Sequence, residues 1–335
     1  NKAITIEDAL LSSSSDKDSD ASHRKSVFEV LWNWADEHHS DRLDGGHRHG
    51  RPPVLKSEFA EMNVLVPPNG THADEIRAAI EPSQRHRHFA SLRSSQALAQ
   101  SVFGTIGAFG CLDLLTEVTA EDGRPAFFKN SRDWALSLEH EVDTLGEPRP
   151  TSIDVLLSGP NHRIAVECKF MESDFGTCSR PRLKPGEASY AKQHCDGSYR
   201  VQAGRKGRCA LSEIGVRYWD HLPQLFDWSS DRDHEPCPFG DVYQLGRNAL
   251  AAVVTPNGTI DPAQGHALIV YDARNPAFQA GGEADRQWEA AIAACLIPGL
   301  MRRVSWQRLL FFIAAAPDLA WLVDDLREKY ALSPN

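Results

Sequence analysis

Two neighbouring segments of the sequence carry ionisable residues at a spacing that suits metal chemistry. The run SIDVLL at 152–157 contains Asp154, and the run RIAVECKF at 163–170 contains Glu167 and Lys169. Because side chains alternate between the two faces of a strand, Glu167 and Lys169 share a face. The intervening SGPNH has the composition of a turn, and a hairpin folded about it pairs residues whose numbers sum to about 321, which sets Asp154 opposite Glu167. Two carboxylates with Cβ atoms about 5 Å apart repel each other unless a cation lies between them, so the pattern predicts a site for a hard divalent metal ion.

The spacing alone leaves a second explanation open for these charges. Alternating polar residues are also typical of the solvent-exposed side of a strand, where an ion cluster contributes little to stability. The segment 152–157 carries no charge besides Asp154, which favours a position inside the sheet. The face of each strand that lies opposite these charged side chains is expected to be apolar. In 152–157 it carries Ile153, Val155 and Leu157, and in 163–170 it carries Ile164, Val166, Cys168 and Phe170.

Further periodic segments predict the elements that position these residues. An apolar stripe from Phe89 onward predicts a helix, and 136–143 is a third strand candidate that would form a meander with the other two. A second helix is predicted at 241–254, with Asp241 as its N-cap, and an apolar strand at 266–273.

An aspartate, a short gap and then Glu-Cys-Lys on an apolar strand resemble the signature of the PD-(D/E)XK nuclease superfamily, which has the restriction-endonuclease-like fold. The ordered pattern covers about 90–275, although Ile153 stands where many members have proline. The resemblance implies an α/β fold with an α-β-β-β-α-β core around a central mixed sheet, and the chain is most similar to bacterial restriction-endonuclease-like proteins. It implies a metal-dependent endonuclease that hydrolyses DNA phosphodiester bonds in restriction or anti-phage defence. A DNA repair or recombination nuclease, an inactive nucleic-acid-binding module and a partner-binding subunit stay open as alternatives.

A site of this kind would hold Mg²⁺, or Mn²⁺, through oxygen ligands. The expected ligands are Asp154, Glu167, the backbone carbonyl of Cys168 and Glu141. Glu139 is the alternative to Glu141 on the same strand, and both could instead be surface carboxylates. The ion would polarise the scissile phosphate and lower the pKa of a bound water, while Lys169 orients that water and offsets the charge that develops.

The predicted helix at 241–254 carries two amide side chains one turn apart. Gln244 and Asn248 fall on a single face of that helix. Gln244 resembles the glutamine that helps to line the active site in the exonuclease-like branches of the superfamily, so it is a candidate catalytic residue. A polar, exposed helix face is the alternative.

A long insertion is predicted between the third strand and this helix, at 171–240. Within it, the segment 180–208 has eight Lys or Arg against Glu187 and Asp196, in a chain whose net charge is -10. A local basic patch suits contacts to a DNA backbone, and a solvated basic loop is the alternative. The candidate DNA-binding residues are Arg200, Arg205, Lys206 and Arg208.

Four of the seven cysteines lie in the same insertion. These candidate ligands of a second metal centre are Cys178, Cys195, Cys209 and Cys237. Zinc is the usual ion for four thiolates, and some relatives of the exonuclease-like branch carry an iron–sulfur cluster, so the identity of the metal stays open. Because none of these cysteines forms a CxxC pair, ordinary buried thiols are the alternative.

Composition limits the remaining possibilities. A chain of 335 residues with 41% hydrophobic and 24% charged residues can bury a large core, so we expect a globular protein. We see no charged-then-apolar leader, and Pro317 and Asp318 interrupt the most apolar stretch at 309–323, so we expect a cytoplasmic protein without a membrane partner. The predicted domains are a helical N-terminal extension with mobile loops at 1–82 and a nuclease-like domain at 83–335. The sequence leaves a homodimer open.

Overall fold

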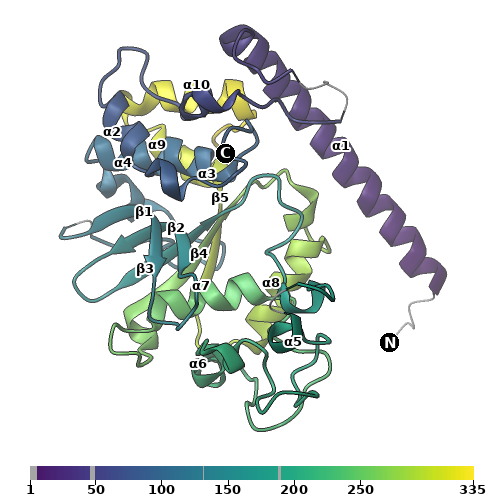
Figure 1. The fold of residues 1–335 in the computed structure, drawn as a ribbon. Coiled ribbons are helices and arrows are strands. Elements are labelled where there is room, and N and C mark those ends of the chain that lie inside the picture. The colour runs from purple at the N-terminus through teal and green to yellow at the C-terminus, as the bar shows by residue number, and fades with distance from the viewer. Residues whose placement is uncertain (1–5, 46–49, 131, 188–189) are drawn as a thin grey trace.

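A five-stranded sheet forms the centre of the computed structural model, which describes residues 6–45, 50–130, 132–187 and 190–335 (Figure 1). Its strands, in the order in which they neighbour one another, are β1 Ala135–Val142, β2 Thr151–Ser158, β3 Arg163–Cys168, β4 Gly265–Tyr271 and β5 Met301–Ser305. β1, β2 and β3 pair antiparallel, whereas β3, β4 and β5 pair parallel. The predicted mixed sheet, the meander and the strand at 266–273 are therefore confirmed. Strand β5 was missed because its sequence, MRRVS, has two arginines and little apolar character.

The register of the β2–β3 hairpin is the one predicted from its turn. Val155 pairs with Val166, and Ser158 pairs with Arg163 at the turn end, so paired numbers sum to 321. When the register is extended by one residue beyond the Val155–Val166 pair, Asp154 lies opposite Glu167. The fold thus brings the two carboxylates together through local hairpin geometry.

Helices cover both faces of the sheet, as Figure 1 shows with α9 and α10 above it and α6, α7 and α8 below it. The α-helices are α1 Ile6–His39, α2 Ala73–Ala78, α3 Ser95–Ala99, α4 Thr105–Ala108, α5 Tyr190–Gln193, α6 Tyr218–Leu225, α7 Tyr243–Val253, α8 Glu283–Ala294, α9 Trp306–Ile313 and α10 Ala320–Tyr330. A π-helical segment, Gln100–Gly104, joins α3 to α4. Both sheet faces are therefore buried, as is usual for an α/β fold.

Alternation along the strands divides the core into two clusters. Ile164, Val166 and Cys168 of β3 pack in the cluster that includes α9 and α10, whereas Ala165 packs in the cluster that includes α7. The predicted faces of β3 are therefore confirmed. In β2 the prediction was partly wrong, because Ile153 lies in the α7 cluster while Val155 and Leu157 lie in the other. Regular pairing with β3 ends at Val155, and Asp154 accepts a hydrogen bond from the backbone of Cys168, so the strand no longer alternates regularly at this point.

Two predicted helix boundaries need correction. The helix expected from Phe89 begins only at Ser95, because Ser94 acts as its N-cap and its side chain accepts from the backbone N–H of Ala97 at 3.3 Å. Phe89 lies in the preceding loop and is buried in a small separate cluster. The helix expected at 241–254 begins at Tyr243, and Asp241 makes no capping hydrogen bond because the N-cap position is occupied by Val242.

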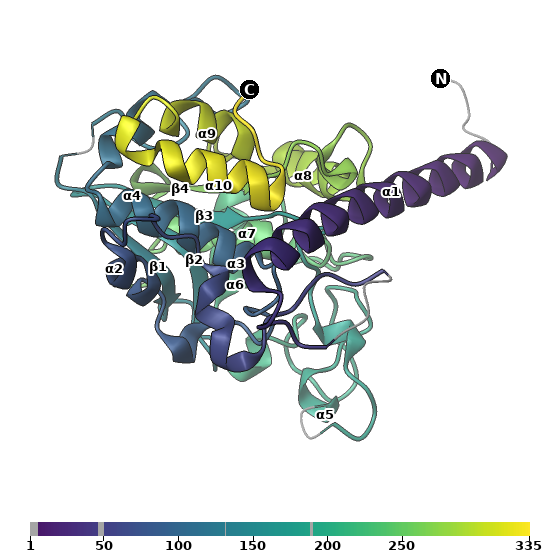
Figure 2. The same ribbon diagram turned by 90° about the horizontal axis from the view of Figure 1, so that it is seen from above.

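The helix α1 packs through one end and extends away from the body of the protein (Figure 2). Val27, Leu31 and Trp34, whose helical spacing in the sequence predicts one amphipathic stripe, are buried in the same cluster as the C-terminal helices. The polar, low-complexity run at 12–20 has a composition that predicts a mobile segment, but it is helical and part of α1. The proposed boundary at residue 82 stays a prediction. No helix in the described part of the chain is both long and apolar enough to cross a membrane.

Candidate active site

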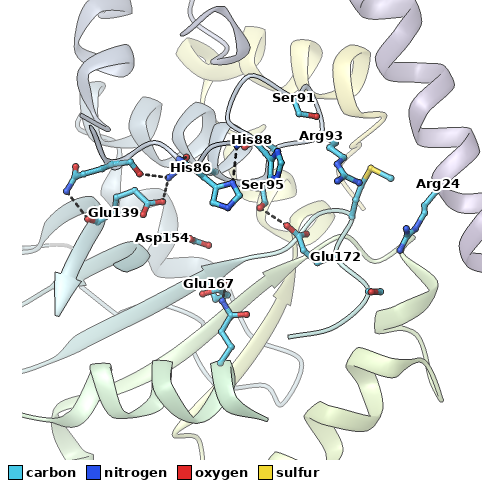
Figure 3. Close-up of a pocket in the computed structure, with 16 residues that line it drawn as sticks. Arg24, His86, His88, Ser91, Arg93, Ser95, Glu139, Asp154, Glu167 and Glu172 are labelled. Atoms are coloured by element: carbon cyan, nitrogen blue, oxygen red, sulfur yellow. Dashed lines mark hydrogen bonds between the residues drawn. The ribbon is translucent and has the colours of Figure 1, made fainter. Parts of the chain in front are cut away.

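Three carboxylates on three adjacent strands line a pocket of about 610 Å³. Glu139 lies on β1, Asp154 on β2 and Glu167 on β3, and the strand registers set each opposite the next. Figure 3 shows all three facing the same space. Glu139 is 7% exposed and Glu167 is 4% exposed, so these residues are not on a solvent-exposed face of the sheet.

Both oxygens of Glu167 are held by neighbouring side chains. Its Oε1 accepts from Nε2 of Gln244 at 2.6 Å, and its Oε2 accepts from Nδ2 of Asn248 at 2.9 Å. Gln244 and Asn248 lie one turn apart on α7, which packs directly on β3 and β4. The predicted shared face of this helix therefore points at the carboxylate instead of at solvent.

Lys169 follows the end of β3 and lies beside Glu167. Its Nζ is 2.9 Å from Oε1 of Glu167 and donates to Oε1 of Gln244 at 2.8 Å. Burial alone would lower the pKa of Lys169, but the carboxylates of Glu167 and Glu172 outweigh that effect and the pKa lies above its usual value. The side chain is therefore protonated at neutral pH and can only donate hydrogen bonds.

Asp154 has the most unfavourable electrostatic environment of the three acids. Burial raises its pKa well above the ordinary value, and the negative charges of Glu167 and Glu139 raise it further. A hydrogen bond at 2.7 Å from the backbone N–H of Cys168 opposes this shift only in part. The positive charge of Lys169 also opposes the shift without cancelling it, so the carboxylate keeps excess negative charge around it, which a bound cation would relieve.

A family model described as Restriction Endonuclease associating with ARP matches residues 32–331. The chain belongs to this family. The matched range includes the whole sheet, the three carboxylates and the insertion, and membership of a restriction-endonuclease family makes the chain a nuclease. Comparisons with curated proteins and with solved structures give no match.

The acid that β1 contributes to the pocket of this nuclease is Glu139, which corrects the expectation of Glu141. Glu141 is exposed and does not line the pocket. Residues two positions apart on a strand, such as Glu139 and Glu141, normally point to the same face of the sheet. Glu139 has a φ of 48°, in the left-handed region, which interrupts the alternation of β1. Its carboxylate accepts from Gln96 and Ser152, and burial still raises its pKa.

The pocket also has a polar rim that the sequence did not reveal. Arg24 of α1, Arg93 and the two histidines His86 and His88 line it (Figure 3). Burial, together with the charges of His88 and Arg87, lowers the pKa of His86, so this side chain is neutral at neutral pH. The run RHRH at 85–88 was a detectable signal of this rim. Arg24 was not detectable, because it comes from a helix far from β2 in the chain.

The four predicted DNA-binding residues of the insertion do not line the described pocket. Arg200 pairs with Asp196 at 2.8 Å and Arg208 with Asp233 at 2.7 Å, so nearby acids compensate both charges. Arg205 is buried and donates to the backbone carbonyl of His194, so its inclusion as a DNA contact is corrected. Lys206 is exposed. The basic composition of the segment therefore overstates its free positive charge.

Replacing Asp154 by Asn should stabilise the metal-free fold at neutral pH. The pKa of Asp154 is higher in the folded state than its unfolded value of about 3.9. Between these two pKa values the folded state binds more protons than the unfolded state. The free energy of unfolding of the wild type therefore falls as pH rises through this range. Asn carries no charge, and its carbonyl oxygen can still accept from Cys168. The gain should be largest above the folded pKa and disappear at about pH 4 and below.

Urea unfolding in EDTA at pH 4 and pH 7.5 measures this effect. Asp143→Asn is the matched control, because Asp143 is an exposed aspartate next to the end of β1 and its replacement should leave the pH dependence unchanged. An equal stability difference at both pH values would contradict the raised pKa of Asp154 in the folded state.

Proposed function

We propose that the chain is a metal-dependent DNA endonuclease of the PD-(D/E)XK type that acts in restriction or anti-phage defence. The observation that carries the proposal is that Asp154 and Glu167, from adjacent strands, line one pocket, while Nζ of the buried Lys169 lies 2.9 Å from Oε1 of Glu167. The order of elements supports it, because a helical segment at 95–108 precedes β1, β2 and β3, and α7 and β4 follow. This is the α-β-β-β-α-β order that the sequence resemblance implies.

The donor set of the pocket fits Mg²⁺ or Mn²⁺. Four carboxylates line the pocket, those of Glu139, Asp154, Glu167 and Glu172, and the raised pKa of Asp154 reflects burial first and then repulsion from Glu167 and Glu139. Hard oxygen donors with excess negative charge are the ligands that these ions prefer. Asp154, Glu167 and the backbone carbonyl of Cys168 would hold the ion, with Glu139 in the place expected for Glu141. When bound, the ion would polarise the scissile phosphate and lower the pKa of a water molecule.

The remaining residues have separate tasks in this proposal. Lys169 stays protonated beside Glu167, so its Nζ can orient a water molecule and offset negative charge on the phosphate, but it cannot accept a proton. Gln244 and Asn248 fix the orientation of Glu167 through hydrogen bonds to its two oxygens. The side chain of Cys168 is buried in the core, where burial raises the pKa of the thiol well above its usual value, so it takes no part.

Cleavage of defined DNA substrates tests the proposal. Circular and linear duplexes, methylated and unmethylated, and single strands are incubated with Mg²⁺, Mn²⁺ or EDTA. We expect circular duplex DNA to be cut with either ion and to stay intact in EDTA. Cutting only from ends would favour a repair or recombination nuclease, and metal-independent binding without cleavage would favour an inactive module.

The arginines at the rim should bind the DNA backbone more strongly than the insertion does, because they lie at the pocket that the backbone would approach. Arg24 pairs with Asp20 at 3.1 Å, so Arg93 should contribute more of this effect than Arg24. Replacing Arg24 and Arg93 together by Gln should weaken DNA binding and reduce the slope of log affinity against log salt by about 1 for each phosphate that the protein no longer neutralises. The matched double variant changes Arg200 and Lys206 to Gln in the insertion, and should have the smaller effect. A lower salt slope in the insertion variant alone would move the DNA-binding surface to 180–208.

A further inference from the structure

Four cysteines that are distant in the sequence line one small cavity in the insertion. The cavity measures about 30 Å³, and its lining includes Cys178, Cys195, Cys209 and Cys237 together with Tyr199 and Trp219. All four cysteines are free thiols and are partly buried. A space of this size exceeds the volume needed for one water molecule, so it can hold one ion among the four sulfurs.

Backbone hydrogen bonds tie the loops that carry these cysteines to one another. The N–H of Cys178 donates to the carbonyl of Gly240 at 2.8 Å, and the N–H of Cys237 donates to the carbonyl of Gly197 at 2.9 Å. Gly197 follows Cys195 by two residues and has a φ of 89°, a conformation that glycine adopts without strain. The convergence of the cysteines therefore follows from specific loop pairing.

Burial raises the pKa of the Cys178, Cys209 and Cys237 thiols, and backbone N–H groups near these three sulfurs oppose that rise in part. That of Arg180 acts on Cys178, those of Leu211 and Ser212 act on Cys209, and those of Phe239 and Gly240 act on Cys237. In each case the N–H group comes from two or three residues after the cysteine. Turns of this form place donors around an anionic sulfur, as outer-shell hydrogen bonds do around metal-bound ligands.

Apolar burial contributes little to the order of the surrounding chain, apart from Tyr199, which stacks on Trp219. No apolar side chain is buried within 176–198 or 200–209, as far as these stretches are described. Regular structure in them is limited to the short helix α5 and a 3-10 turn at Arg180–Arg182. Ordering each residue costs roughly 1–2 kcal/mol of backbone entropy, which burial of apolar surface does not offset here. A bound metal would supply the missing stabilisation.

We propose that Cys178, Cys195, Cys209 and Cys237 bind one Zn²⁺ ion that holds the insertion in its fold. Among the described residues, no three of these sulfurs lie within 4.8 Å of one another, whereas sulfurs around tetrahedral zinc are about 3.8 Å apart. Binding must therefore draw the loops together slightly. An iron–sulfur cluster would need far more room than the cavity offers, which favours a single ion. This site is separate from the carboxylate pocket and does not depend on the proposed nuclease activity.

Metal analysis of the purified full chain tests the site directly. We expect about one zinc per chain by elemental analysis, and a cobalt-substituted protein with the sulfur-to-cobalt charge-transfer absorbance of a tetrathiolate. Cys209→Ser should lower zinc retention against a competing chelator by at least about tenfold. The matched control Cys111→Ser/Cys295→Ser, which changes two partly buried cysteines outside the insertion, should keep the full zinc content.

Limited trypsin digestion gives a second measurement that does not depend on metal content alone. Chelation should loosen the loops and so speed cleavage after Arg182, Lys192 and Lys206, whose side chains are already exposed, while the sheet stays intact. A folded wild-type chain that contains neither zinc nor iron, or one with these cysteines paired as disulfides, would overturn the site. Iron with acid-labile sulfide would overturn zinc as its occupant.

Discussion

Asp154→Asn and Glu167→Gln should each reduce DNA cleavage by a factor on the order of 10³. The two carboxylates come from adjacent strands, and the pKa of Asp154 is raised by burial and by the charge of Glu167. Each replacement keeps the shape of the side chain but removes one of the negative charges proposed to hold Mg²⁺. The measurement is the initial rate of plasmid cleavage at saturating Mg²⁺, together with the Mg²⁺ concentration that gives half the maximal rate.

Glu141→Gln is the matched control for this pair. Glu141 lies on β1, two residues after Glu139, but its side chain is exposed and does not line the pocket, so cleavage should stay within about twofold of the wild type. Thermal unfolding checks that the Asp154 and Glu167 variants remain folded. Wild-type cleavage by both variants would place the nuclease activity elsewhere in the chain.

The local part of the site could be predicted from the sequence because hairpin geometry determines it. The turn at SGPNH sets the β2–β3 register, and strand alternation places Glu167 and Lys169 on one face. Helical spacing likewise places Gln244 and Asn248 together, and both contact Glu167. Each of these contacts joins residues of one hairpin or of one helix face. The period of 2 along a strand and of 3.6 along a helix is therefore enough to predict which side chains share a face.

The rest of the site depends on backbone details and on contacts between distant segments. The left-handed φ of Glu139 directs this acid, and not Glu141, into the pocket, and no residue pattern signals that conformation. Arg24 reaches the rim because α1 packs against α10, a contact between opposite ends of the chain. Sequence periodicity predicts that α1 has an apolar stripe but cannot say what covers it.

The distribution of charge in the fold also explains how an acidic chain can act on a polyanion. Net charge is -10, and the pocket itself concentrates Glu139, Asp154 and Glu167. A divalent cation bound among these three acids would offset two of their negative charges and Lys169 the third, and Arg24 and Arg93 at the rim add positive charge where a phosphate backbone would approach. The proposed metal would therefore help to admit DNA as well as support the reaction.

Lys169→Met should lower the maximal rate of DNA cleavage by about 10² to 10³ while the half-saturating Mg²⁺ concentration does not increase. Lys169 is proposed to act on the water and the phosphate, not on the metal, and its protonated Nζ lies 2.9 Å from Glu167. Met fills a similar volume without the charge. Loss of this charge also removes a competitor for Oε1 of Glu167, so Mg²⁺ should bind at least as tightly as in the wild type.

Lys206→Met is the control for this change, because it removes an exposed lysine of the insertion and should leave both kinetic values close to those of the wild type.

Removing one member of a buried ion pair destabilises many proteins. In Lys169→Met, however, Gln244 and Asn248 still donate to Glu167, and bound Mg²⁺ would add a positive charge beside it. Unfolding is therefore followed with and without Mg²⁺, and the ion should restore more stability to Lys169→Met than to the wild type. A variant that cuts at the wild-type maximal rate but needs much more Mg²⁺ would mean that Lys169 supports metal binding and not the reaction itself.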